Sequence, residues 1–288
     1  MRRALVPLLL LLAVAAAGCG RDRSTSPEPA PARRIVSMSP TATEMLFAIG
    51  AGSQVVAVDS NSNYPKEAPR TDLSAYQPNL EAIAGYKPDL VVYSDDPGEL
   101  AAGLRKLGIK SLAEPAATSL DDTYAQLDQL GRATGHVAEA GKLTATMKAE
   151  IAKIVAAGRP ERHLTYYHEL DKNLYTATSR TFIGQLYSLL GLENIADAAD
   201  KDKSGYPQLS AEYVVKADPD LIFLADTKCC GQSARTVAAR DGWDRIAAVR
   251  SGGVVELDDD VASRWGPRVV DFLKIISAKT QTLEAVGS

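Results

Sequence analysis

The chain has 288 residues, of which 45% are apolar and 24% charged, enough for one large domain or two lobes of ordinary size. Its 36 Asp and Glu residues outnumber its 32 Lys and Arg residues, so a basic surface for nucleic acid is not expected. Three cysteines are too few for a disulfide scaffold or for a zinc site made of four thiolates.

Residues 1–18 have the pattern of a signal peptide, with a positive start and then an uncharged run too short to span a bilayer. Small residues precede Cys19, which fits a lipoprotein acylation site; the alternative is an ordinary signal peptide with an incidental cysteine. Residues 19–32 are rich in Pro and Ser and predict a disordered tether. We therefore expect an exported chain, held by lipid on the extracellular or periplasmic side of the cell membrane.

Strands alternate with helices from residue 34 onwards. Arg34–Ser37 and Val55–Val58 have the composition of strands, and Thr43–Ile49 between them that of an amphipathic helix. Ser39 precedes this helix as a cap, and Gly50 follows it as a stop. This alternation predicts parallel strands in an α/β layer fold.

One motif occurs twice along the chain, with its Glu, Pro, Asp and Leu residues at a constant offset. The two copies are Asn79–Ile83 followed by Lys87–Val92, and Ser210–Val214 followed by Asp218–Phe223. In each copy a capping residue begins a short helix, and Glu81 or Glu212 lies in its first turn. The repetition predicts two α/β lobes of the same plan, at residues 33–118 and 159–288.

Residues 119–158 between the lobes have apolar side chains at helical spacing. Gly135 is expected to separate two helices, of which the second covers about His136–Ala157. A long helix is a stiff connection, unlike a flexible Gly/Ser linker, so we expect only small motions of one lobe relative to the other.

Cys229 and Cys230 follow the expected strand Leu221–Leu224 and are therefore placed on a loop. Three uses of this pair stay open: a vicinal disulfide that shapes a binding loop, two free thiols, or a metal or redox role. The three histidines lack the spacing of metal ligands, and Asp258–Asp260 favours a solvated turn over a cation site. No metal site is predicted.

Four passages, spread over residues 34–268, carry a resemblance to a known family. They are Arg34–Glu44, Asn79–Ile83 with Lys87–Val91, Tyr206–Glu212, and Asp258–Arg264 with Gly266–Arg268. Together they resemble the periplasmic binding proteins of ABC importers that have a rigid backbone helix, the group for cobalamin, haem and ferric siderophores. Within that group they are most similar to the cobalamin-binding branch.

The resemblance implies two similar α/β lobes, with mostly parallel sheets, joined by one long helix (a class III substrate-binding protein). It also implies a monomer without catalysis or cofactor, which delivers its ligand to the transmembrane subunits of a permease that works with an ATPase. In that family one glutamate on each lobe docks onto permease arginines, and Glu81 and Glu212 occupy those positions. Their alternative role is that of carboxylates favoured by the helix dipole.

The resemblance places the ligand between the lobes, at loops that follow strands. The expected ligand-binding residues are Ser39, Pro40, Tyr76, Ser94, His168, Tyr175, Tyr206, Asp260 and Arg264. For the tyrosines the alternative is ordinary half-buried packing, and for Arg264 a surface ion pair with Asp260. Aromatic residues of the cobalamin binders are replaced here by Asn61, Ala75 and Ser94. Cobalamin is ranked first as the ligand, a ferric siderophore second and haem third.

Two other classes were compared with this interpretation. A surface hydrolase is disfavoured because the sequence has no Gly-x-Ser-x-Gly, His-Glu-x-x-His or phosphate-binding loop motif. A zinc or manganese binding protein of the related group needs a His-rich ligand set, whereas this chain has three histidines. Capture and delivery of a bulky nutrient is therefore the leading hypothesis.

Overall fold

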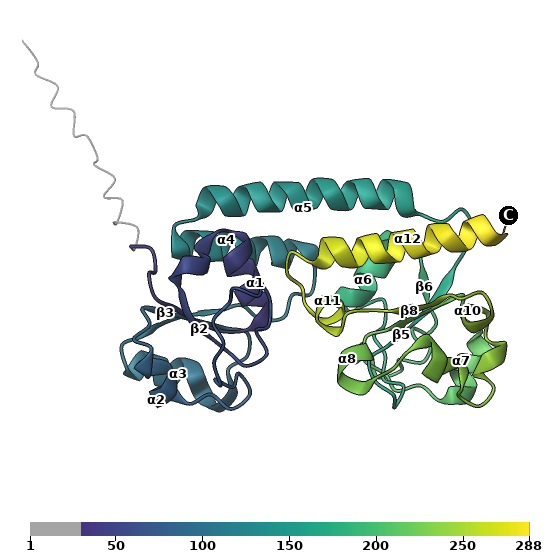
Figure 1. Ribbon diagram of the computed structural model, residues 1–288, viewed down its shortest axis with the longest axis horizontal. Coiled ribbons are helices and arrows are strands. Elements are labelled where there is room, and N and C mark those ends of the chain that lie inside the picture. Colours follow the sequence, from purple (N-terminus) through teal and green to yellow (C-terminus); the bar gives the residue numbers. More distant parts are fainter. Residues whose placement is uncertain (1–29, 288) are drawn as a thin grey trace, which may run out of the picture. The chain divides into compact units, whose positions relative to one another are not determined.

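The computed structural model describes residues 30–287. From Pro31 onwards the chain forms one compact unit, with two parallel sheets of four strands and helices that cover and join them (Figure 1). The expected signal peptide, most of the expected tether, and Cys19 lie outside the described residues.

The N-terminal lobe is built on a sheet with strand order β2-β1-β3-β4, in which all neighbours are parallel. Its elements are β1 (Ile35–Met38), α1 (Pro40–Ala48), a 3-10 turn (Ala51–Gln54), β2 (Val55–Val58), α2 (Leu80–Gly85), β3 (Leu90–Tyr93), a 3-10 turn (Pro97–Glu99), α3 (Leu100–Lys106) and β4 (Lys110–Ala113). The expected cap at Ser39 is confirmed, because its Oγ accepts the N–H of Ala42 at 3.3 Å. The helix begins earlier than expected, because Pro40 is compatible with a first helical turn.

The C-terminal lobe repeats this plan with strand order β6-β5-β7-β8, again all parallel. Its elements are β5 (Thr165–Glu169), α6 (Phe182–Leu189), β6 (Glu193–Asn194), α7 (Ala211–Ala217), β7 (Leu221–Leu224), α8 (Thr227–Cys230), α9 (Ala234–Ala238), a 3-10 turn (Trp243–Arg245), α10 (Ala247–Arg250), β8 (Val254–Glu256) and α11 (Asp259–Ser263). Helices lie on both faces of such parallel sheets, and β5 and β7 are accordingly almost fully buried.

The two copies of the repeated motif fold in the same way. Asn79 caps α2 by accepting the N–H of Ala82 at 3.0 Å, and Ser210 caps α7 with its hydroxyl. Glu81 and Glu212 lie in the first turns of these two helices, and both side chains are exposed. In Figure 1, α2 and α7 lie on the side of the unit that faces away from the long helix α5 (Val137–Gly158).

The lobes are joined by α4 (Leu120–Thr134) and by α5, with the break at Gly135 that the sequence predicts. The sequence did not predict α12 (Val269–Gly287), which runs along α5 and is tied to it by a bond from Gln281 Nε2 to the Ala157 carbonyl, at 2.9 Å. The stiff connection therefore consists of packed helices rather than of one isolated rod.

One apolar cluster runs through both lobes and the joining helices, and includes Ile35, Leu130, Tyr166 and Phe272. Each lobe also has one smaller apolar cluster of its own. Because the lobes share a core, changing their relative position would expose apolar surface to water. Among residues 30–287, no helix has both the length and the apolar character needed to cross a membrane.

Candidate functional site: a cleft between the lobes

A cavity of about 580 Å³ lies between the two lobes. It is lined at the carboxyl ends of β1 and β3, where parallel sheets commonly bind ligands, and by α11 with the residues that follow it. Six of the nine expected ligand-binding residues line it: Ser39, Pro40, Tyr76, Ser94, Asp260 and Arg264. Further polar lining residues that were not expected to bind the ligand include Thr41, Asp59, Asn63, Asp95 and Ser263.

Hydroxyl groups stiffen the N-terminal wall of this cleft. Ser94 donates to the Oγ of Ser39 at 2.7 Å, which links the ends of β3 and β1. Behind them the hydroxyl of Ser62 contacts that of Thr43 at 2.9 Å and donates to Asp59 at 2.6 Å. Burial raises the pKa of Asp59, although the bond from Ser62 acts in the opposite direction. The wall therefore offers small polar groups that are already held in place.

Arg264 is buried and joins the lobes. Its guanidinium donates to Glu44 on α1 at 2.7 Å, to Asp260 at 2.7 Å, and to the carbonyl of Asn61 and the side chain of Asn63 at 3.0 Å each. The alternative expected for Arg264 was a surface ion pair with Asp260. The ion pair is present, but Arg264 is buried, so its placement at the surface was wrong. The donors of this side chain are engaged within the protein rather than directed freely at a ligand.

Glu44 accepts from a second arginine as well. The Nε of Arg268 donates to it at 2.8 Å, and the same guanidinium stacks over the ring of Tyr64, 4.3 Å from the ring centroid. Glu44 and Arg264 are both almost fully buried, and Arg268 is largely so. We call Glu44, Arg264 and Arg268 the interlobe bridge. Local sequence patterns gave no sign of it, because Glu44 lies 220 residues before Arg264 and 224 residues before Arg268.

Three expected ligand-binding residues do not line this cavity. His168 is fully buried on β5 and its Nδ1 contacts the hydroxyl of Tyr187 at 2.9 Å, so the expectation that it faces the ligand is wrong. Burial lowers the pKa of His168 to about 4, so the ring is neutral at physiological pH. Tyr175 and Tyr206 are exposed on the C-terminal lobe, but the structure does not bring them into the cavity lining.

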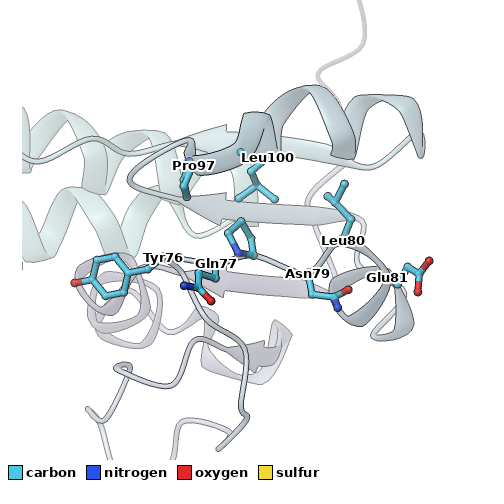
Figure 2. A pocket seen from close by; sticks show the side chains of 9 residues that line it. Tyr76, Gln77, Asn79, Leu80, Glu81, Pro97 and Leu100 are labelled. Carbon is cyan, nitrogen blue, oxygen red and sulfur yellow. The ribbon is translucent and has the colours of Figure 1, made fainter.

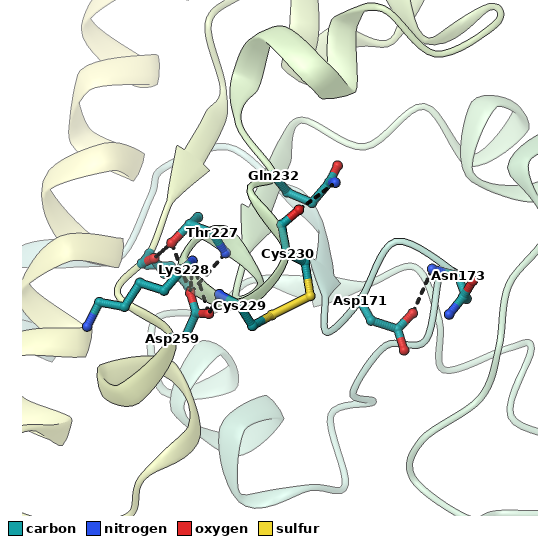
Figure 3. Close-up of a disulfide and its surroundings, with 9 residues drawn as sticks. Asp171, Asn173, Thr227, Lys228, Cys229, Cys230, Gln232 and Asp259 are labelled. Carbon is teal, nitrogen blue, oxygen red and sulfur yellow. Dashed lines mark hydrogen bonds between the residues drawn. A yellow bond between two sulfur atoms is a disulfide. The ribbon is translucent and has the colours of Figure 1, made fainter. Parts of the chain in front are cut away.

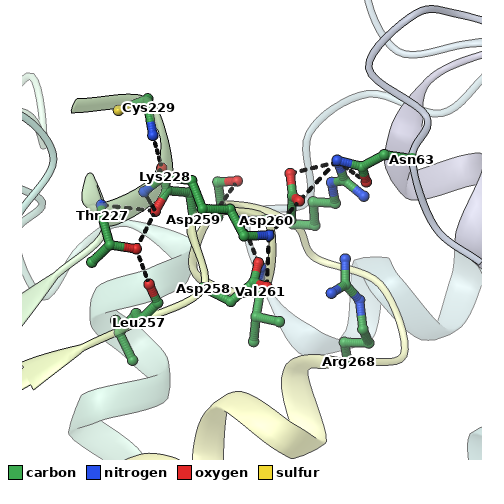
Figure 4. Close-up of polar contacts among 12 residues, drawn as sticks. Asn63, Thr227, Lys228, Cys229, Leu257, Asp258, Asp259, Asp260, Val261 and Arg268 are labelled. Carbon is green, nitrogen blue, oxygen red and sulfur yellow. Dashed lines mark hydrogen bonds and ion pairs between the residues drawn. The ribbon is translucent and has the colours of Figure 1, made fainter. Parts of the chain in front are cut away.

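Cys229 and Cys230 end the short helix α8, where a loop was expected. Figure 3 shows the disulfide that joins them. The helix forms because the carboxylate of Asp259 accepts the N–H groups of Thr227, Lys228 and Cys229 at 2.8–3.1 Å, which satisfies the free donors of its first turn (Figure 4). Of the three uses that the sequence left open, this geometry favours the vicinal disulfide.

We expect the native chain to carry this disulfide. A Cys19→Ser variant leaves only Cys229 and Cys230, so thiol counting on the folded protein should find no free thiol before reduction and both thiols after it. Two free thiols in the unreduced protein would contradict the bond.

Lys228 connects α8 to the cleft. Its Nζ lies 2.7 Å from Asp258 and 3.1 Å from Asp260, and Asp260 in turn accepts from Asn63 at 3.0 Å (Figure 4). A chain of polar contacts thus runs from the disulfide helix along α11 to the opposite lobe. The expected solvated turn at Asp258–Asp260 is therefore the start of a helix, and its carboxylates are partnered. Residues 30–287 contain no cluster of three His, Cys, Asp or Glu side chains suited to a metal ion.

Two buried carboxyl groups, Asp226 and Glu114, have no hydrogen-bond partner within the described part of the chain. Burial raises the pKa of Asp226 to about 7, with a contribution from the nearby Glu169, and it raises the pKa of Glu114 to about 8. Both groups are therefore protonated in the folded protein at mildly acidic pH, where the unfolded chain has already lost these protons.

Stability should consequently fall as the pH rises from about 4.5, by up to about 1.4 kcal/mol per pH unit for each group. The contribution of Asp226 should level off near pH 7 and that of Glu114 near pH 8. The variant Glu114→Gln isolates one of these contributions from all others. Denaturant unfolding at several pH values should show the variant gaining stability relative to the native protein as the pH rises towards 8. If the difference in free energy of unfolding between the two proteins does not change with pH, the raised pKa of Glu114 is contradicted.

Comparison with known proteins agrees with this geometry. A family model described as periplasmic binding protein matches residues 35–261. An uncharacterized ABC transporter substrate-binding lipoprotein of Bacillus subtilis, YvrC, is 30% identical over 83% of this chain and 77% of its own length. A cobalamin-binding protein of Halobacterium salinarum is 33% identical over 83% of this chain and 66% of its own length.

Among solved structures, a possible iron-binding periplasmic solute-binding protein from Staphylococcus epidermidis is 27% identical. It superimposes with a TM-score of 0.74 over 87% of this chain and 99% of its own. The expected class, two parallel α/β lobes of the substrate-binding type, is confirmed.

Proposed function

Because the chain belongs to the periplasmic binding protein family, we propose that it captures a corrinoid, cobalamin, in the cleft between its lobes and delivers it to a permease. In general terms, it is the substrate-binding component of an ABC importer. Binding proteins of this family are non-catalytic transport subunits. The observation that carries the proposal is the cavity between the lobes, with six expected residues in its lining.

The polarity of the cleft favours cobalamin over an anionic ferric siderophore. Its lining offers hydroxyl, amide and carboxylate groups, such as Ser39, Asn63 and Asp260, which match the amide side chains of a corrin. The one arginine in the lining, Arg264, already donates to Glu44 and its neighbours, so little positive charge is left for an anionic chelate. The cobalamin-binding relative supports the same ranking.

A ferric siderophore is the second candidate and haem the third. The relative from Staphylococcus epidermidis, described as a possible iron-binding protein, favours a ligand that contains iron. The aromatic positions replaced by Asn61 and Ala75 reduce the area for stacking on a corrin. Tyr76, exposed on the rim of the cleft, supplies one aromatic face.

We further propose two attachments to the membrane. Cys19 would carry the lipid anchor that holds the exported chain at the outer face of the membrane. Glu81 and Glu212, exposed on equivalent helices of the two lobes, would dock onto cationic side chains of the permease. Both helices lie on one side of the unit, which supports simultaneous contact of the two lobes with one partner (Figure 1).

The ligand is tested by mixing the full chain with cyanocobalamin, a ferric hydroxamate or haem, followed by desalting and an absorption spectrum. We expect the corrinoid spectrum to stay with the protein. Retention of the ferric hydroxamate without any corrinoid would replace cobalamin by the second candidate. Retention of none of the three would contradict capture of this group of ligands.

A further inference from the structure

The N-terminal lobe has a second cavity, of about 620 Å³, beside the ligand cleft. We call it the groove; it extends along residues 76–81 at the start of α2 and along the turn before α3 (Figure 2). Tyr76, Pro97 and Leu100 line both the groove and the cleft. These three residues therefore form a shared wall, with one side towards the cleft and the other towards the groove.

The groove has an apolar floor and an acidic end. Leu80, Pro97 and Leu100 supply the floor, while Tyr76 and Glu81 lie at its two ends (Figure 2). No Lys or Arg lines it, and Glu81 forms no ion pair within residues 30–287. A protein segment that carries a guanidinium or ammonium group next to an apolar side chain is complementary to such a surface.

Within the shared wall Leu100 is fixed in the core, whereas Tyr76 is loosely packed. The side chain of Tyr76 is 78% exposed, so little packing fixes its ring before a ligand arrives. Pro97 begins a turn in which Gly98 (φ 63°) and Glu99 (φ 56°) are both left-handed, a conformation that is costly for a glutamate. Glu81, in contrast, is held on a helix capped by Asn79.

We propose that the groove receives a basic, partly apolar segment of the membrane partner, and that cargo packed against Tyr76 reshapes the groove through the shared wall. The partner would thereby distinguish the loaded protein from the empty one at the surface where it docks. This inference rests on the proposed function, since it takes Glu81 as a docking residue and the cleft as the cargo site. It adds that the cleft and the groove are coupled through Tyr76, which lines both.

The coupling is tested by amide NMR spectra of the full chain at saturating cyanocobalamin. We expect ligand-dependent shifts at Glu81 and Gly98, which line the groove but not the cleft, and none at Glu212 on the other lobe. Tyr76→Phe keeps the ring and should keep these shifts, whereas Tyr76→Ala at full occupancy should lose them. Unchanged groove amides in the saturated native protein, or shifts that survive in Tyr76→Ala, would overturn the coupling.

The partner is tested by filling the groove with Gln77→Trp, a position that lines the groove but not the cleft. Uptake of labelled cyanocobalamin by cells with the native permease should fall by about tenfold or more, with cargo affinity as in the native protein. Arg105→Trp, exposed on α3 outside the groove, is the matched control and should transport normally.

Failure of this inference is distinguishable from failure of the proposed function. Suppose that the native protein binds cargo and that uptake requires Glu81 and Glu212. Normal uptake by Gln77→Trp would then overturn only the proposal that the groove receives the partner. A protein that retains no cargo would overturn the proposed function, whatever the groove variants do.

Discussion

Replacing Glu81 and Glu212 together by alanine is expected to abolish uptake of cargo while leaving its affinity within about a factor of two of the native value. Both carboxylates are exposed in the first turns of α2 and α7, and neither lines the cleft between the lobes. Uptake of labelled cargo into cells, set beside a dissociation constant measured on the purified chain, gives both quantities.

The matched control removes two exposed acids elsewhere. Glu139→Ala on α5 with Asp244→Ala in the C-terminal lobe changes the net charge by the same amount and should leave uptake unchanged. If the control variant also loses uptake, the effect comes from overall charge rather than from docking. If the variant of Glu81 and Glu212 loses cargo affinity instead, these carboxylates act in ligand binding and the docking proposal fails.

Glu44→Ala, which removes the centre of the interlobe bridge, should lose more stability than any other substitution proposed for this protein. In Glu44→Ala, the buried Arg264 and the largely buried Arg268 both lose the carboxylate to which they donate. Breaking a buried ion pair from one side typically costs about 3–5 kcal/mol, because the remaining charge is left without compensation. Denaturant unfolding of the native and variant proteins, with cargo absent, measures the difference.

A surface ion pair provides the comparison for this prediction. Asp128→Ala removes one partner of Arg132 on the exposed face of α4 and should cost no more than about 1 kcal/mol. Equal stability losses in Glu44→Ala and Asp128→Ala would show that the bridge does not hold the lobes together.

The parts of this structure that could be predicted from the sequence are those determined by neighbouring residues. The caps at Ser39, Asn79 and Ser210 were expected from residue type and spacing, and each accepts the backbone bond that defines it. The break at Gly135 followed from its freedom to adopt a positive φ, which is 80° here. Because the motif occurs twice, the same local features predicted two lobes of the same plan.

His168 was misplaced for a physical reason. Every residue of β5 from Tyr166 to Glu169 is buried, because helices cover both faces of the parallel sheet. The alternation that normally separates inward from outward positions is therefore missing, and a histidine in the core looks the same in the sequence as one at the mouth of the cleft.

The interlobe bridge and the disulfide helix depend on contacts between distant residues. Asp259 satisfies the N-terminus of α8 from a position 30 to 32 residues further along the chain, and without it Thr227–Cys230 has the composition of a loop. The same holds for Glu44, which no local pattern connects with its arginines. The cleft could thus be located from the sequence, but not the contacts that fix its shape.

The central claim, that cargo binds between the lobes, is tested most directly by calorimetric titration of cyanocobalamin into the native chain and into Ser94→Trp. Ser94 lines the cleft beside Ser39, so an indole at this position would occupy the cavity. Ser188→Trp, on α6 outside the cavity, is the matched control. We predict one ligand bound per native or control chain and a loss of affinity of about 100-fold or more in Ser94→Trp. Equal affinity in all three proteins would contradict binding in the cleft.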